Sequence, residues 1–154
     1  MKKLLSLILV LIISSTFIGC SNAQYINLKK KPSNHYYTEE MYKLISTEKF
    51  SISAFDTDVY KELHPKEEDD KILLDFVKSL KSTNFINKPD NLPDKPKFKM
   101  FIKTSKDKYV INIYDDNIIS IFPWDGVFEE DFINMDKVPL AYRLDSFCKY
   151  VFNK

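Results

Sequence analysis

The sequence contains very little of the residues on which most metal and catalytic sites depend. Its 154 residues include two His, two Cys, two Gly and a single Arg. These numbers leave little material for a zinc site, a Cys/His nucleophile or a Gly-rich phosphate loop. The formal net charge is only +1, so the basic excess of a nucleic-acid binder is also missing. We therefore expect no metal, no cofactor and no nucleic-acid partner.

The rest of the composition is that of an ordinary globular protein. Hydrophobic residues make up 44% of the chain and charged residues 29%, which excludes a disordered or collagen-like chain. The length accommodates one domain and no second full domain. Lysine outnumbers arginine 22 to 1, and Ile, Asn and Tyr are abundant, as in A/T-rich genomes. This bias points to a low-GC Gram-positive bacterium.

The N-terminus has the pattern of a secretory leader. Lys2 and Lys3 precede an apolar run from residue 4 to residue 13 that is interrupted only by Ser6. Together with the following residues to Gly19, this stretch is about sixteen residues long, whereas a bilayer-spanning helix needs about 20. We therefore expect residues 1–19 to be a signal peptide.

The leader ends on Phe17-Ile18-Gly19-Cys20, which resembles the lipobox of bacterial lipoproteins, with Phe17 where that motif usually has Leu. The resemblance implies cleavage before Cys20 and a diacylglyceryl thioether on its sulfur. A two-chain lipid gives stable attachment, so the expected location is the extracytoplasmic face of the cell membrane. An uncleaved anchor and a plain secretory signal are the alternatives.

Residues 20–34 have no apolar periodicity and are predicted to form a lipidated tether, followed by one globular domain over residues 35–154. Lys29, Lys30 and Lys31 lie in this tether. Lysines close to an anionic bilayer add about 1 kcal/mol each of attraction. The alternative is that they only keep the tether solvated.

Hydrophobic periodicity within the domain predicts three helices and four strands. Thr38 is a candidate N-cap for a helix over residues 39–47, residues 50–54 alternate as a strand, and a stronger helix is expected over residues 65–81. Residues 82–96 are predicted to be a loop, and residues 127–138 to be irregular or to contain one short element. Three strands around residues 97–103, 109–114 and 119–122 would form a meander, and a helix opened by Pro139 would end the chain.

One apolar stripe per helix and one apolar face per strand can be buried together if the helices cover one side of an antiparallel sheet. The predicted fold is therefore an α+β two-layer sandwich with the element order αβαβββα. Its solvent face would carry Lys97, Lys99, Lys103 and Asn112, together with Phe101 and Tyr114. The alternative is the inverse arrangement, in which this face is the buried one.

The most unusual local composition is in residues 122–132, which hold the single Trp, three Phe and four acidic residues. Aromatic rings next to carboxylates are typical of peptide or sugar recognition. The candidate binding residues are Trp124, Asp125, Phe128, Glu129 and Glu130. The alternative is that Trp124 and Phe128 plug the open end of the core.

Other chemistry-bearing residues favour structural explanations. Asp56 and Asp58 lack the further acids and the Gly of a calcium loop, and His35 and His64 lack partners at zinc-like spacing. Cys148 lies on the apolar stripe of the last predicted helix, which indicates a buried thiol rather than a nucleophile.

The run from Lys108 to Phe152, KYVINIYDDNIISIFPWDGVFEEDFINMDKVPLAYRLDSFCKYVF, resembles a family of short clostridial-type lipoproteins known only as a domain of unknown function. The resemblance extends from about Phe50 onward. It implies a lipobox leader and one small domain, and it brings no known activity.

Three classes of function stay open at this stage. The favoured one is a non-enzymatic, lipid-anchored domain that binds a peptide, an envelope polymer or a protein. The second is an extracytoplasmic hydrolase with a carboxylate pair such as Asp125 and Glu129, which would have to lie about 5–9.5 Å apart in one concave pocket. The third is a structural envelope protein, which predicts no pocket.

Overall fold

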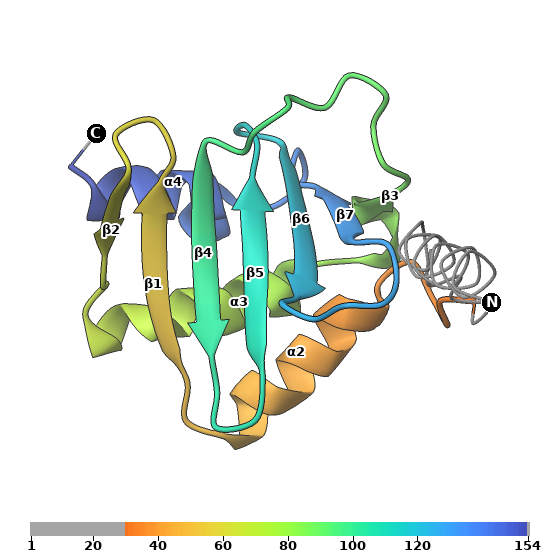
Figure 1. Cartoon of the computed structure of the whole chain (residues 1–154), viewed down its shortest axis with the longest axis horizontal. Helices are drawn as coiled ribbons and strands as arrows, with labels where there is room; N and C mark the ends of the chain where they lie inside the picture. Colours follow the sequence, from red (N-terminus) through yellow and green to blue (C-terminus); the bar gives the residue numbers. More distant parts are fainter. Residues whose placement is uncertain (1–29, 154) are drawn as a thin grey trace, which may run out of the picture.

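The computed structural model describes residues 30–153, so the leader, Cys20 and Lys29 lie outside the described residues. Seven antiparallel strands form one sheet in the order β2-β1-β4-β5-β6-β7-β3. Helices α2 (Tyr36–Thr47), α3 (Lys71–Ser79) and α4 (Leu144–Val151) all lie on the same side of this sheet (Figure 1). The predicted α+β two-layer sandwich is therefore confirmed.

The central meander is also confirmed. Strand β4 (Phe98–Lys103) pairs with β5 (Lys108–Ile113), and β5 pairs with β6 (Ile118–Pro123). Strand β1 (Ser51–Asp56) adds to β4 and runs two residues past its predicted end. The turns that join β4 to β5 and β5 to β6 are short, which forces these neighbouring strands to be antiparallel.

The sheet also contains three short strands. Strand β7 (Asp131–Asn134) is the one short element allowed for residues 127–138, whereas β3 (Phe85–Ile86) lies in a segment predicted to be a loop and β2 (Lys61–Leu63) was not predicted. Two to four residues are too few to show a period-two pattern. Strand β2 pairs with β1, β7 pairs with β6, and β3 pairs with β7. The formation of these short strands therefore depends on tertiary contacts rather than on their own sequences.

The N-terminal helix begins differently from the prediction. It starts at Tyr36, so Thr38 is its third residue and not its N-cap. The backbone amide and the hydroxyl of Thr38 both donate to Oδ2 of Asp131, at 2.7 and 2.8 Å. The free amides at the helix start are thus partly satisfied by a carboxylate from β7, which sequence-local capping rules could not reveal.

The other two helices are shorter than predicted. Residues 67–70 form a 3₁₀ turn, and α3 begins only at Lys71. Pro139 precedes a second 3₁₀ turn (Leu140–Tyr142), and α4 begins at Leu144. Leu140 is 73% exposed and does not belong to the buried stripe of α4.

The core lies between the helices and the inward face of the sheet. Met100, Ile111 and Ile119 from the meander are fully buried against Met41 of α2 and Phe76 of α3. Cys148 of α4 is also fully buried, and this burial raises the pKa of its thiol. The thiol therefore remains protonated and unreactive at neutral pH, in agreement with the structural explanation.

Candidate functional site

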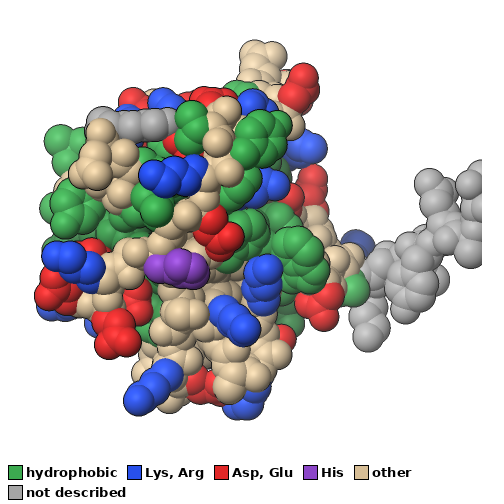
Figure 2. Space-filling view, turned by 60° about the vertical axis from the view of Figure 1, so that its left-hand side comes forward, with side chains coloured by type: hydrophobic (Ala, Val, Ile, Leu, Met, Phe, Trp, Pro, Cys, Tyr) green, Lys and Arg blue, Asp and Glu red, His purple; other side chains and the backbone are tan. Residues whose placement is uncertain are grey.

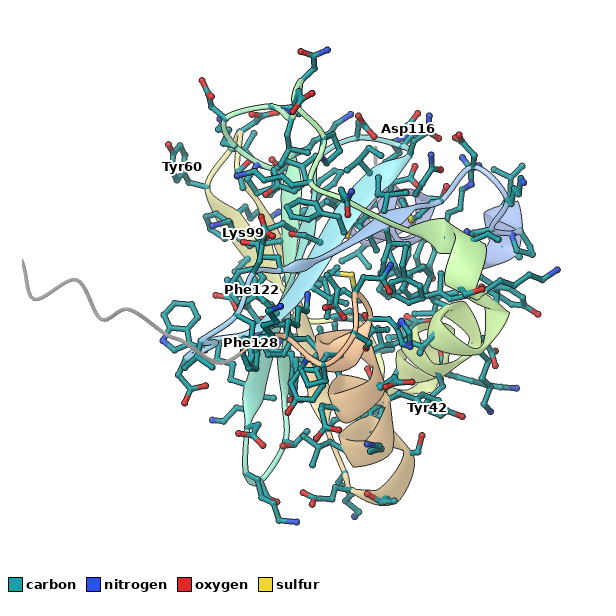
Figure 3. All side chains as sticks on the ribbon, turned by 90° about the vertical axis from the view of Figure 1, so that its right-hand side faces the viewer. Tyr42, Tyr60, Lys99, Asp116, Phe122 and Phe128 are labelled. Carbon is teal, nitrogen blue, oxygen red and sulfur yellow. The ribbon has the colours of Figure 1, made fainter. Side chains whose placement is uncertain are left out.

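The sheet has one face that the helices do not cover. In Figure 3, the labelled Tyr60, Lys99 and Phe122 lie on one side of the sheet, while the helices and Tyr42 lie on the other. We call the uncovered side the open face. The prediction that Lys99, Lys103 and Phe101 point away from the helices agrees with the pairing register, because their neighbours Met100 and Ile102 are fully buried.

Trp124, the single Trp of the chain, is 66% exposed. Its backbone amide donates to the carbonyl of Lys108 at 2.8 Å, which fixes the start of the loop after β6. The ammonium of Lys108 lies 4.4 Å from the indole centroid and 4.7 Å from the ring centroid of Phe101. The alternative that Trp124 plugs the core is therefore wrong. We call Phe101, Lys108 and Trp124 the aromatic patch.

A groove begins next to the aromatic patch and runs towards the edge formed by β1 and β2. It has a volume of about 360 Å³. Its lining combines hydroxyl, carboxylate, imidazole and ammonium groups with one aromatic ring, from Ser51, Ser53, Glu62, His64, Phe101, Lys103 and Lys108. In Figure 2, lysine and hydrophobic side chains are interspersed over this side of the molecule. We call this feature the open-face groove. Such a lining suits a polar ligand with a flat or apolar part.

A hydrogen bond and a ring contact with α2 hold the loop that carries Trp124. The hydroxyl of Tyr37 accepts a hydrogen bond from the amide of Phe128 at 2.7 Å. The ring of Phe128 packs edge-on against Tyr36, with 5.8 Å between the centroids, and is half-buried. A Cβ at Gly126 would approach the hydroxyl of Tyr37 to 3.1 Å, so glycine suits this close approach. Phe128 thus anchors the loop, and its role as a binding residue stays a prediction.

The predicted acidic binding residues do not gather around Trp124. Asp125 is exposed, whereas Glu129 and Glu130 line a second groove of about 510 Å³ beside β3 and β7, together with Lys31 and Phe132. Asp125 does not line this second groove. The suggested carboxylate pair of Asp125 and Glu129 is therefore not brought together in this groove.

The centre of the open face buries polar groups that the sequence did not single out. Asn112 and Ser120 face each other across β5 and β6 and are almost fully buried, although Asn112 was expected in solvent. Oδ1 of Asn112 and Oγ of Ser120 make no hydrogen bond of good geometry among the described residues. Burial and the nearby Glu130 carboxylate raise the pKa of the neighbouring Tyr114 phenol.

The remaining candidates from the sequence have structural roles. Oδ1 of Asp56 accepts hydrogen bonds from the amides of Asp58 and Val59 and so closes the turn after β1. The Asp58 carboxylate lies 3.0 Å from the ammonium of Lys95. His35 packs its ring on Phe85, at 5.2 Å between centroids, while His64 lines the open-face groove. Within residues 30–153 no group of three His, Cys, Asp or Glu side chains is arranged to hold a metal ion.

A family model described as "Domain of unknown function (DUF4883)" matches residues 31–148. The chain is also similar to the crystal structure described as "Putative Lipoprotein from Clostridium perfringens", with 41% sequence identity and a TM-score of 0.74. That similarity covers 81% of this chain and 100% of the other. No curated protein matches the chain. In residues 30–153 no helix has the length and apolarity needed to cross a membrane.

Proposed function

The chain belongs to the DUF4883 family of clostridial-type lipoproteins, and we propose that it is a lipid-anchored extracytoplasmic protein that acts by binding. The anchor would be the lipid on Cys20. The ligand would occupy the open-face groove, with Trp124 at its end. Peptides, envelope polymers and envelope proteins are the ligand classes that fit this location.

The anchor is supported by the leader and by the similarity to a protein described as a lipoprotein. Lys2 and Lys3, the apolar run and Phe17-Ile18-Gly19-Cys20 are the features that lipoprotein processing recognises. A diacylglyceryl group supplies the two chains that stable attachment requires.

Binding is supported above all by the exposure of Trp124. Large aromatic side chains are costly to leave in water and are enriched at sites where proteins bind partners. Trp124 lies beside a groove that offers both charged and hydroxyl groups. A purely structural envelope protein does not require such a groove. The second groove does not support the hydrolase hypothesis, because Glu129 lines it and Asp125 does not.

Mass spectrometry tests the anchor. We expect the mature protein from membranes to begin at an acylated Cys20, and we expect the variant Cys20→Ser to accumulate as an unprocessed precursor. An unmodified N-terminus at another residue would contradict the anchor.

Chemical cross-linking on intact membranes tests the binding site. We expect the wild type and Leu140→Ala to capture the same partner and Trp124→Ala to lose it, because truncating a central aromatic contact costs about 2 kcal/mol of binding free energy. Leu140 is the matched control, since it is a large exposed hydrophobic residue in the helical layer. Equal capture by all three proteins would exclude Trp124 from the binding site.

A further inference from the structure

Lys31 fixes the point at which the chain enters the domain. Its ammonium lies 2.6 Å from Oδ1 of Asp131, donates to the carbonyl oxygen of Glu129 at 2.8 Å and lies 5.3 Å from the ring centroid of Tyr37. The Asp131 side chain is fully buried and the Lys31 side chain is only 17% exposed. Lys31 is therefore part of the folded domain, and it is not a solvated residue of the predicted tether.

This entry point lies beside the loop between β6 and β7. Glu129, which accepts the hydrogen bond from Lys31, belongs to the same loop as Trp124. Figure 1 shows the described chain beginning next to this loop and next to β7. The anchored end of the domain and the exposed side chain of Trp124 are thus on neighbouring parts of the surface.

The connection between the lipid and Lys31 is short. Ten residues, 21–30, separate Cys20 from Lys31. Even a fully extended chain of this length spans at most about 36 Å. A domain of this size has a radius of gyration of about 14 Å. The surface around Lys31 is therefore never more than about one domain diameter from the bilayer.

We propose that the loop carrying Trp124 rests on the surface of the phospholipid bilayer, with the indole in the headgroup region. This inference rests on the lipid anchor at Cys20 proposed above, and it names the bilayer as a partner of the aromatic patch. Trp is favoured at membrane interfaces because its ring is largely apolar and its N–H can still reach water or headgroups. The open-face groove would then be held close to the membrane surface.

Charge makes little contribution to this contact. Lys30 and Lys108 are exposed near the loop, but Asp125 and Glu129 are exposed within it. These two pairs of opposite charges nearly cancel, so attraction to anionic lipids cannot drive the contact. The contact instead depends on insertion of the indole and on the high local concentration that the anchor provides. It should therefore depend only weakly on salt.

Quenching by brominated lipids tests the proposal, because Trp124 is the single Trp of the chain. Full-length processed protein is reconstituted in phosphatidylglycerol vesicles whose lipids carry bromine at shallow acyl positions. An indole held about 5–10 Å into the interface lies close to these bromines, so we expect its emission to fall by about half and to shift to the blue. The same quenching is expected at low and at high salt.

The double variant Trp124→Phe/Leu140→Trp is the matched control. It moves the single indole to an exposed position in the helical layer, where we expect quenching by a water-soluble quencher but not by the brominated lipids. Circular dichroism of both proteins checks that they are folded.

The outcomes separate the two proposals. A lipidated Cys20 without lipid quenching of Trp124 overturns the bilayer contact and leaves the anchor and the groove in place. Equal lipid quenching of both proteins also overturns it, since no particular surface would then face the bilayer. Absence of the lipid on Cys20, found by mass spectrometry of the same sample, overturns both proposals.

Discussion

The two faces of the sheet are built from the same strands but have different chemistry. The face under the helices is a continuous apolar layer in which Met100, Ile111 and Ile119 are fully buried. The open face alternates rings and lysines with the polar side chains of Ser120 and Asn112, which are buried beside Tyr114. Polar groups buried in this way stabilise little. We infer that the covered face holds the fold together and that the open face is shaped for recognition.

The largest effect is expected where a charged pair interrupts the apolar covered side. Asp131→Ala removes the partner of Lys31 and the acceptor for both donors of Thr38. We expect a loss of about 3–5 kcal/mol in the free energy of unfolding, because a buried charge and two buried donors are left unpaired. Urea denaturation measures the loss.

The exposed Asp136→Ala is the control for this variant and should change stability by less than about 0.5 kcal/mol. A similar small loss for Asp131→Ala would show that the Lys31 contact does not hold the N-terminal segment.

The second comparison takes one residue from each face of the meander. Ile111→Ala should cost about 3 kcal/mol of unfolding free energy, since it opens a cavity in the fully buried layer. Phe101→Ala on the open face should cost only about 1 kcal/mol, although it removes more atoms, because solvent already reaches the ring. Equal losses in urea denaturation would mean that both faces contribute equally to stability.

The third comparison uses alkaline pH. Burial raises the pKa of Tyr109 on the covered side strongly and that of Tyr114 on the open face less. The folded state therefore keeps both phenol protons to higher pH than the unfolded chain does. Stability should be unaffected below about pH 10 and should fall above it, by up to about 1.4 kcal/mol per pH unit for each tyrosine.

Tyr109→Phe should remove more of this alkaline dependence than Tyr114→Phe. Unfolding is followed by circular dichroism between about pH 9 and about pH 11.5, a range that brackets the ordinary tyrosine pKa of about 10. For each variant, this measures how steeply the free energy of unfolding falls with pH. If Tyr114→Phe removed more of the alkaline dependence than Tyr109→Phe, the phenol on the open face would have the more strongly raised pKa, which would contradict the prediction.

The smallest effect is expected for Trp124→Ala. The side chain is 66% exposed, so its removal should change the free energy of unfolding by less than about 1 kcal/mol. Urea denaturation of the wild type and of the variant measures this change. A loss of several kcal/mol would mean that the ring packs in the core after all.

Sequence periodicity predicted the long elements because each of them has an apolar face that repeats. The meander around Met100, Ile111 and Ile119 is the best example, since its three strands alternate regularly and are joined by short turns. The short strands β2, β3 and β7 show no such pattern. The early start of α2 likewise depends on Asp131, which lies 93 positions from Thr38.

The candidate site was only partly predictable. The composition around Trp124 identified the loop, and alternation along β4 placed Phe101 and Lys103 on the open face. Lys108 could not be linked to Trp124 because their contact depends on the register between β5 and β6. Ser51, Glu62 and His64 join the groove only because β1 inserts between β2 and β4, an order that the sequence does not specify.

The two edges of the sheet are its shortest strands, with three residues in β2 and two in β3. An exposed edge offers unpaired backbone groups on which another copy of the chain can add as a further strand, and this is a common start of aggregation. Proteins anchored in one membrane plane meet their neighbours far more often than proteins in free solution. Edges this short, with Lys61 and Glu62 exposed on β2, give such neighbours little to pair with. The domain can therefore be crowded on a surface without polymerising through its sheet.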